Sequence, residues 1–165
     1  MSLITPRTIC TPLSDIHVEK LMKMYSEKDS FKYISPLKGK EPEYYKAFIQ
    51  RSINANQLET CVWSVNLKSG EFIGTINLNY SEVIEGFQIG CHLKRDYWGN
   101  GFAKELFHEL IRFAFEERKL PEIGSIYETN NLASAKLMQL FQLEIQSVKM
   151  EGEIEIAICK LANPF

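Results

Sequence analysis

The sequence predicts an α+β fold in which helices cover both faces of a mixed, mostly antiparallel sheet. Three neighbouring segments in the middle of the chain change to a two-residue apolar period, which is typical of an antiparallel meander. Segments with a helical period lie before and after this meander, so the helices can pack on its faces. The chain has 165 residues and no Pro/Gly/Ser-rich linker or repeat, so we predict a single domain over residues 1–165.

The first part of the chain predicts one strand and two helices. The strand is expected at residues 8–13 and the first helix at residues 15–25. Apolar side chains that can share one face of this helix are Ile16, Leu21, Met24 and Tyr25. Residues 35–42 are expected to form a loop, and Pro42 is well placed as the first-turn proline of a second helix.

The middle of the chain predicts the meander. Its strands are rich in β-branched and aromatic residues and are expected at residues 60–67, 72–80 and 87–94. The short polar segments 68–71 and 81–86 separate them. Consecutive strands joined this closely must pair antiparallel.

The last part of the chain predicts two more helices and three strands. A strongly amphipathic helix is expected over residues 102–117, and Pro121 marks where it stops. A strand at 123–127, a helix at 131–141 and a hairpin of strands 143–150 and 154–161 follow. The predicted order is therefore β-α-α-β-β-β-α-β-α-β-β.

Composition and charge exclude several classes of function. Lys and Arg number 19 against 21 Asp and Glu, a net charge of −2, which provides no broad positive field for nucleic acid. No apolar run approaches the roughly 20 residues of a membrane span, so we expect a cytoplasmic protein. The four cysteines and three histidines are scattered, which predicts reduced packing cysteines and no metal site.

The segment of residues 95–103, between a strand and a helix, is the most informative for chemistry. Backbone N–H groups at a helix N-terminus lack internal partners, and a phosphate binds well there. Gly99 and Gly101 let the backbone approach an anion, and Ala103 keeps the first turn open. A pyrophosphate cradle is one interpretation, and a tight turn with glycines at positive φ is the other. The spacing fits neither a P-loop nor a dinucleotide-binding Rossmann motif.

Three blocks of sequence resemble one family. They are Ile89-Gly90-Cys91-His92-Leu93, then Tyr97-Trp98-Gly99-Asn100-Gly101-Phe102-Ala103, then Asn131-Leu132-Ala133-Ser134-Ala135-Lys136-Leu137. Their order and their positions on the predicted elements resemble the GNAT superfamily of N-acetyltransferases, and within it the RimJ/RimL-like ribosomal-protein N-terminal acetyltransferases. The resemblance implies a GNAT-like fold whose sheet splays between the fourth and fifth predicted strands, with the pantetheine of acetyl-CoA in the gap.

The resemblance also implies roles for individual residues. Trp98, Gly101 and Ala103 match the pyrophosphate motif, so the amides from Gly99 to Ala103, including those of Asn100 and Phe102, would hold the pyrophosphate. Asn131 and Ser134 match the block that contacts pantetheine and assists the departing thiolate, and a backbone N–H near Leu93 would stabilise the oxyanion. Structural alternatives are packing for Trp98, an N-cap for Asn131 and local backbone bonding for Ser134.

Two positions depart from the family pattern. Gln88 stands where relatives commonly carry a glutamate that accepts the amine's proton through water, and Gln cannot act as a base. Gln142-Leu143 replaces the usual Gly-Phe, so a different turn is expected after the last helix. His92 lies on the same face of its strand as Gln88 and is the candidate titrating group, linked to the amine through water. The other possibility is that the substrate arrives neutral.

These observations predict an enzyme that transfers the acetyl group of acetyl-CoA directly to a primary amine. An α-amine of pKa about 8 is roughly a tenth neutral at pH 7, whereas a lysine amine near 10.4 is almost wholly charged. Without the usual carboxylate, the acceptor is expected to be a peptide or protein N-terminus, an amino acid or a small amine. The alternatives are a catalytically weak acyl-CoA-binding protein and a domain without a CoA site. The resemblance also implies a homodimer.

Overall fold

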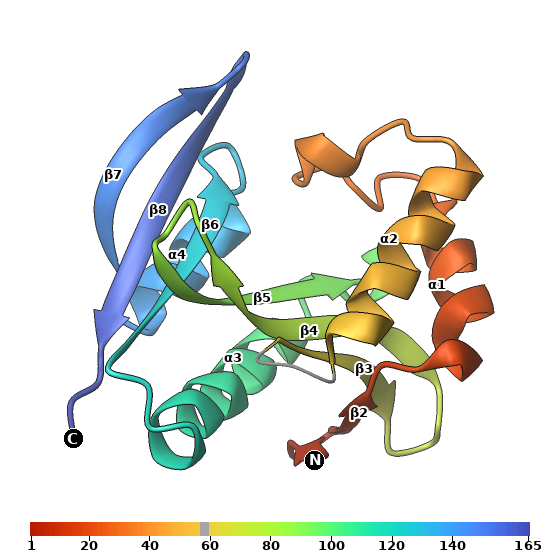
Figure 1. Ribbon diagram of the computed structural model, residues 1–165, viewed down its shortest axis with the longest axis horizontal. Helices are drawn as coiled ribbons and strands as arrows, with labels where there is room; N and C mark the ends of the chain where they lie inside the picture. The colour runs from red at the N-terminus through yellow and green to blue at the C-terminus, as the bar shows by residue number, and fades with distance from the viewer. Residues whose placement is uncertain (57–59) are drawn as a thin grey trace.

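The computed structural model describes residues 1–56 and 60–165, which form an eight-stranded sheet with four α-helices (Figure 1). The strands are β1 (Leu3–Ile4), β2 (Thr8–Pro12), β3 (Cys61–Leu67), β4 (Phe72–Ser81), β5 (Gly86–Leu93), β6 (Glu122–Glu128), β7 (Glu144–Glu151) and β8 (Ile154–Ala162). The helices are α1 (Val18–Tyr25), α2 (Pro42–Ala55), α3 (Phe102–Arg112) and α4 (Leu132–Leu140). This α+β arrangement confirms the predicted fold class.

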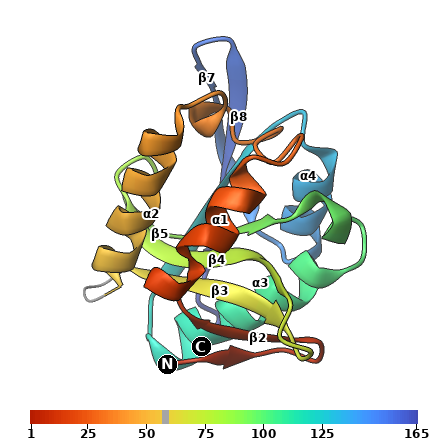
Figure 2. The ribbon, with the colours of Figure 1, turned by 90° about the vertical axis from the view of Figure 1, so that its right-hand side faces the viewer.

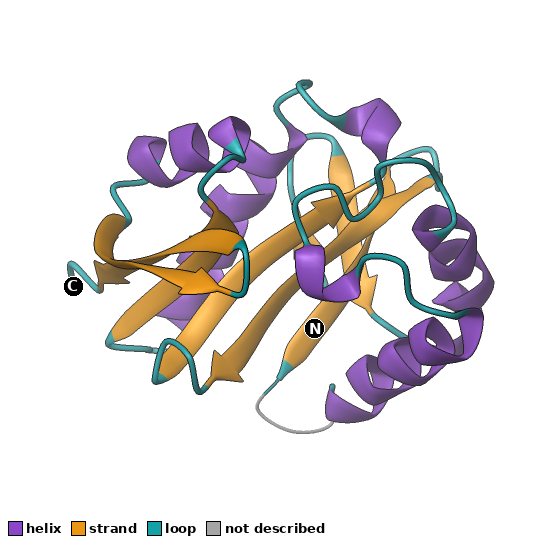
Figure 3. Ribbon diagram, turned by 90° about the horizontal axis from the view of Figure 1, so that it is seen from above, coloured by secondary structure: helices purple, strands orange, loops and turns teal. Residues whose placement is uncertain are grey.

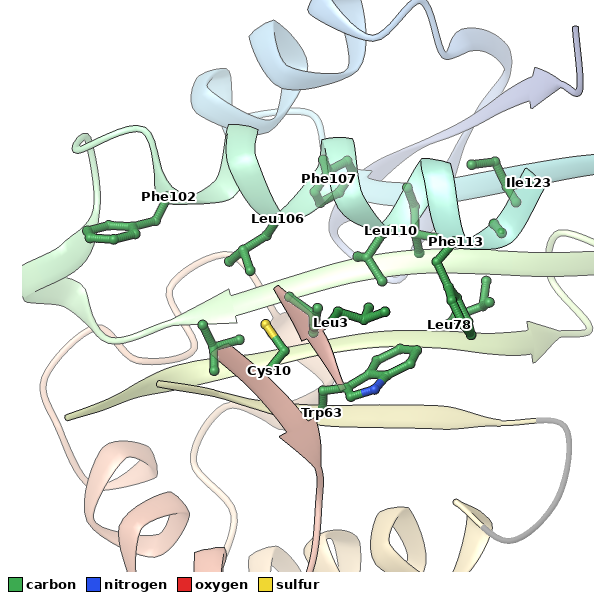
Figure 4. Close-up of a cluster of buried hydrophobic side chains, with 14 of the residues drawn as sticks. Leu3, Cys10, Trp63, Leu78, Phe102, Leu106, Phe107, Leu110, Phe113 and Ile123 are labelled. Atoms are coloured by element: carbon green, nitrogen blue, oxygen red, sulfur yellow. The ribbon is translucent and has the colours of Figure 1, made fainter. Parts of the chain in front are cut away.

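The helices pack on both faces of the sheet (Figures 1 and 2). On one face α1 and α2 bury a smaller cluster that includes Leu21, Met24 and Ile49. On the other face α3 lies along the strands, and Leu106 and Leu110 are fully buried beneath it (Figure 4). Burial of each such side chain stabilises the fold by about 1.5–3 kcal/mol. The apolar face of each helix therefore determines how that helix packs on the sheet.

The strand order is β1-β2-β3-β4-β5-β6-β8-β7, with every pair antiparallel except β5 and β6. Those two strands are parallel and pair at a single register position, Gln88 with Gly124. The Ser125 hydroxyl donates to the Ile89 carbonyl at 3.0 Å just beyond this point. Seen from above, the two halves of the sheet then diverge (Figure 3). The predicted splay between the fourth and fifth predicted strands is therefore present.

The structure corrects three details of the prediction. It adds β1, a two-residue strand that pairs with β2. The chain over 15–17 forms a 3-10 turn ahead of α1, and Ile16 is 78% exposed instead of sharing the buried helix face. A different turn was expected after α4 because glycine is absent, but Gln142 itself adopts the left-handed conformation at φ 59, and the Leu143 N–H donates to the Met138 carbonyl. Gln142 thus adopts the conformation that favours glycine at a helix end.

The described residues contain neither a membrane-spanning helix nor a cluster of metal-binding side chains. No described helix has the length and apolarity to cross a membrane. Residues 1–56 and 60–165 contain no group of three or more His, Cys, Asp or Glu side chains that could hold a metal ion. All four cysteines are free thiols, and Cys10 and Cys159 are buried.

Candidate functional site

A cleft of about 1470 Å³ runs along the divergence of β5 and β6 and collects most of the residues singled out from the sequence. The predicted site residues that line it are Gln88, His92, Leu93, Trp98, Gly99, Gly101, Phe102, Ala103, Asn131 and Ser134. Asn100 is exposed beside it, and its side chain donates to the Trp98 carbonyl at 2.9 Å. A smaller cavity of about 500 Å³ lies against residues 26–40 and contains none of the predicted residues.

One end of the cleft is the N-terminus of α3. Gly99 and Gly101 have φ 72 and 82, a backbone region that only glycine enters without strain. Among the residues that the structure describes, the amide N–H groups of residues 99–104 have no hydrogen-bond partner. They coincide with the positive end of the helix dipole. The tight-turn interpretation of the glycines is confirmed, and the same positive-φ turn leaves these amides unpartnered, as the cradle interpretation requires.

Arg7 supports this loop from the turn between β1 and β2. Its guanidinium forms an ion pair with Glu105, donates to the Asn100 carbonyl at 2.9 Å and lies 3.9 Å from the centre of the Phe102 ring. Phe102 is only 8% exposed, so its side chain packs and only its amide can face a ligand. No local pattern in the sequence indicates this role for Arg7, because the contact joins residues about a hundred positions apart.

Trp98 packs beside the cleft and also lines it. Its indole N–H donates to the Leu93 carbonyl at 2.8 Å, and its ring lies 6.1 Å from Tyr33 and 4.9 Å from the Arg95 guanidinium. The indole thus fixes the chain as it leaves β5 and turns toward α3. This bond favours the packing alternative for Trp98 and ties the end of β5 to the loop that follows it.

Asn131 and Ser134 lie where the second block predicts, at the start of α4. The Asn131 side chain caps the helix by accepting from the Ser134 N–H at 3.1 Å. The N-cap alternative for Asn131 is therefore present in the structure. The Ser134 hydroxyl has no hydrogen-bond partner within the described ranges, and Ser134 lines the cleft, so its side chain is available to a ligand.

The floor of the other end is formed by neutral polar side chains of β4 and β5. The cross-strand pairs on this face are Thr75 with His92, Asn77 with Gly90, and Asn79 with Gln88. The residues between them on β4 are buried against α3, in keeping with strand alternation. Cys91 also points to the α3 side, and burial raises the pKa of its thiol to about 12. Cys91 also lines the cleft, and its contacts with the core under α3 favour a packing role.

His92 is part of an aromatic cluster and not a free base. Its ring stacks on Tyr25 at 5.7 Å and lies 5.1 Å from Phe31. Its Nε2 bonds to the Ser30 carbonyl at 2.7 Å. Burial lowers the pKa of His92 to about 4. The imidazole is therefore neutral at pH 7 and has no titration between pH 6 and 8, which does not favour a general-base role.

The loop between α1 and α2, residues 26–41, crosses the divergence of β5 and β6. On β5, four residues past the Gln88–Gly124 pair, the His92 ring forms a hydrogen bond with the Ser30 carbonyl. On β6, also four residues past the pair, the buried Glu128 accepts from the Ser35 N–H at 2.7 Å and from its hydroxyl at 2.8 Å. The two strands thus hold one loop between them. Sequence reasoning missed Glu128, whose only signal is a carboxylate at the end of a short strand.

Comparisons with known proteins find a matching family model and similar sequences. The model of the acetyltransferase (GNAT) domain family matches residues 7–141. The uncharacterised N-acetyltransferase p20 of Bacillus licheniformis is 27% identical over 156 residues, which cover 92% of this chain and 87% of p20.

Solved structures share the fold. An acetyltransferase of the GNAT family from Bacillus anthracis superposes with a TM-score of 0.83 at 18% identity, covering 99% of both chains. The ribosomal-protein alpha-N-acetyltransferase RimL, solved in complex with coenzyme A, has a TM-score of 0.83 at 12% identity and covers 98% of both chains. At these identities the likeness establishes the fold alone.

Proposed function

Because the chain belongs to the acetyltransferase (GNAT) family, we propose that this acetyl-CoA-dependent enzyme acetylates the neutral form of a primary amine. The acceptor class is a peptide or protein N-terminus, an amino acid or a small amine. The observation that carries this proposal is the contrast between the two ends of one cleft. Unpartnered amides lie at the α3 end, and neutral amides in place of a carboxylate lie along β4 and β5.

The α3 end suits a pyrophosphate. The unpartnered amides of residues 99–104 are consecutive in the chain and lie at the first turn of α3 and the loop before it. Hydrogen bonds from such groups to charged phosphate oxygens are short and strong. Lys104 and Lys136 line the same cleft and add positive charge. From here pantetheine would follow the gap between β5 and β6 and contact Asn131 and Ser134.

The reaction is direct transfer between two bound substrates. Acetyl-CoA supplies an activated thioester when it is bound. The amine nitrogen forms a bond to the acetyl carbon and the carbon–sulfur bond breaks. The nitrogen loses one proton to water, and the departing thiolate takes up a proton from solvent to leave as the thiol. The protein's part is to hold the two reactants together. Correct orientation of bound reactants can lower the activation free energy by about 7–11 kcal/mol. The Ser134 hydroxyl is the proposed donor to the departing sulfur.

The acceptor class follows from the charges around the amine. Gln88 cannot take a proton, the half-buried Cys91 has its pKa raised to about 12, and His92 has its pKa lowered to about 4. An amine of pKa about 8 needs little help to lose its proton near neutral pH, unlike a lysine side chain near 10.4. An acyl-CoA-binding protein without activity is not favoured, since the family is one of acetyltransferases.

Thiol release from acetyl-CoA with a panel of amines tests the proposal. We expect turnover with free N-termini and small amines of pKa near 8, and a rate that follows the amine's own pKa. Calorimetry with acetyl-CoA alone separates binding from catalysis. Tight binding of acetyl-CoA without thiol release for any amine would restore the acyl-CoA-binding alternative.

A further inference from the structure

The acceptor end of the cleft contains a directed chain of amides on β4. The Asn79 side-chain NH2 donates to the Tyr80 carbonyl at 3.0 Å, so its oxygen points back along the strand. That oxygen accepts from the Asn77 side-chain NH2 at 2.6 Å. Both bonds run in one direction, and together they fix which atom of Asn77 faces away from Asn79. The Asn77 side-chain oxygen is the free end of the chain.

The position of this oxygen is set by a glycine on the neighbouring strand. Asn77 is paired with Gly90, and a Cβ at Gly90 would lie 2.6 Å from the Asn77 Oδ1. The amide therefore lies directly over the middle of β5, two residues past Gln88, where β5 and β6 part. Any larger residue at position 90 would displace it. Within the described residues no donor bonds to this oxygen, and both Asn77 and Gly90 line the cleft.

The carboxylates around the cleft are not available to an amine. The acidic, basic and histidine side chains that line it are Arg51, His92, Lys104, Glu128, Lys136 and Glu151. Both oxygens of Glu128 are bonded to Ser35, and Glu151 is paired with Lys149 at 3.4 Å. Thus no carboxylate that lines the described cleft lacks a partner. The acceptors on the β4–β5 floor are neutral side-chain oxygens of Thr75, Asn77 and Gln88, and the Asn77 oxygen is the one whose direction is fixed by a hydrogen bond of its own amide.

We propose that Asn77 binds and orients the acceptor amine, with Gly90 and Asn79 holding its side chain in place. This inference rests on the proposed function. The Asn77 Oδ1 accepts one N–H of the neutral amine and thereby turns the nitrogen lone pair toward the thioester beside β5. An amide oxygen can orient an amine in this way without stabilising an ammonium as a carboxylate would. Compared with a carboxylate, the site therefore gives less preference to the charged form of a high-pKa amine at the binding step.

Three variants test the assignment against two matched acceptors, a peptide with a free α-amine and an N-acetylated peptide with one lysine. Asn77→Ala should lower kcat/KM for the α-amine about 10-fold, the worth of one well-placed hydrogen bond, with the KM for acetyl-CoA within about 2-fold of wild type. Gly90→Ala keeps Asn77 but displaces its amide, and should show the same loss. Asn77→Asp installs a carboxylate, and should raise the ratio of lysine to α-amine acetylation about 10-fold.

Asn66→Ala is the matched control, because Asn66 lies on β3, bonds to the Ser64 hydroxyl and does not line the cleft. It should leave both acceptors unaffected. Wild-type turnover with silent Asn77→Ala and Gly90→Ala variants, or an unchanged acceptor ratio in Asn77→Asp, would overturn the inference alone. No thiol release by wild type with any amine would overturn the proposed function, and this inference with it.

Discussion

The two ends of the cleft are built in different ways. The α3 end comes from one continuous stretch, residues 93–104, in which two glycines at positive φ expose consecutive amides. The acceptor end comes from several elements: the amides of β4, Gly90 of β5, Glu128 of β6 and the loop 26–41 that crosses between the strands. A local motif can specify the first end, whereas the second exists only once distant segments have packed.

This difference suggests how each end responds to mutation. Changes at the α3 end should act on affinity for acetyl-CoA and leave the acceptor end intact. Changes at the acceptor end should act on amine choice or on the stability of the crossing loop.

His92 tests whether the β5 anchor of the crossing loop is structural. Its folded pKa of about 4 lies below the ordinary 6.5, so the unfolded chain takes up the proton first as pH falls. The contribution of His92 to the free energy of unfolding should therefore be constant above about pH 6.5 and fall by up to about 3 kcal/mol between pH 6.5 and 4. His92→Gln keeps a donor for the Ser30 carbonyl and should remove this part of the fall in denaturant titrations.

Burial also lowers the pKa of His17, but that group is present in both proteins, so the difference between them isolates His92. The pH–rate profile of His92→Gln should match wild type between pH 6 and 8. A profile that flattens in this range would instead make His92 the general base.

Gly101→Val tests the α3 end. The new side chain would be held at φ 82 and its Cβ would meet the Arg7 guanidinium at 3.3 Å, which distorts the turn that presents the amides. We expect acetyl-CoA affinity to fall at least 10-fold, about 1.4 kcal/mol, by calorimetry. Gly70→Val is the control, since Gly70 has φ 95 in the β3–β4 turn with open space around its Cβ. Equal affinity loss in the control would remove the cradle assignment.

Asn131 and Ser134 separate capping from chemistry at the start of α4. Asn131→Ala removes the acceptor for the Ser134 N–H and should cost about 1 kcal/mol of stability. Ser134→Ala keeps that bond and should leave the unfolding free energy almost unchanged while turnover falls. If Ser134→Ala lowers the melting temperature and turnover per folded molecule holds, the hydroxyl has only a structural role.

Gln142→Gly is the smallest expected effect and should leave both ends of the cleft unchanged. Gln142 occupies the left-handed region at φ 59, which strains a residue with a Cβ. Glycine relieves this strain but loses more entropy on folding, so we expect a gain of about 0.5 kcal/mol in urea unfolding. A loss of stability would show that Gln142 makes contacts that outweigh its backbone strain.

Much of the fold was predictable because its apolar periods are regular. The amphipathic pattern of residues 102–117 corresponds to α3 and the π-helical turn that extends it, and Pro42 begins α2 as expected. Ile16 was assigned wrongly because a short 3-10 turn has a different period from the helix it precedes. Asn77 and Asn79 alternate along β4 with the buried Ile76 and Leu78, and this pattern could have predicted a polar cleft on one face of β4.

The sequence by itself determined the layers and the glycine-bearing turn before α3, since both depend on residues close together in the chain. The tertiary structure decided which side chains surround the amine. Asn77 faces Gly90 through sheet register, Glu128 meets Ser35 across the divergence of two strands, and Arg7 reaches the α3 turn from the opposite end of the chain. Such contacts join segments whose separation in sequence leaves no periodic trace, because they are fixed by packing and not by local conformation.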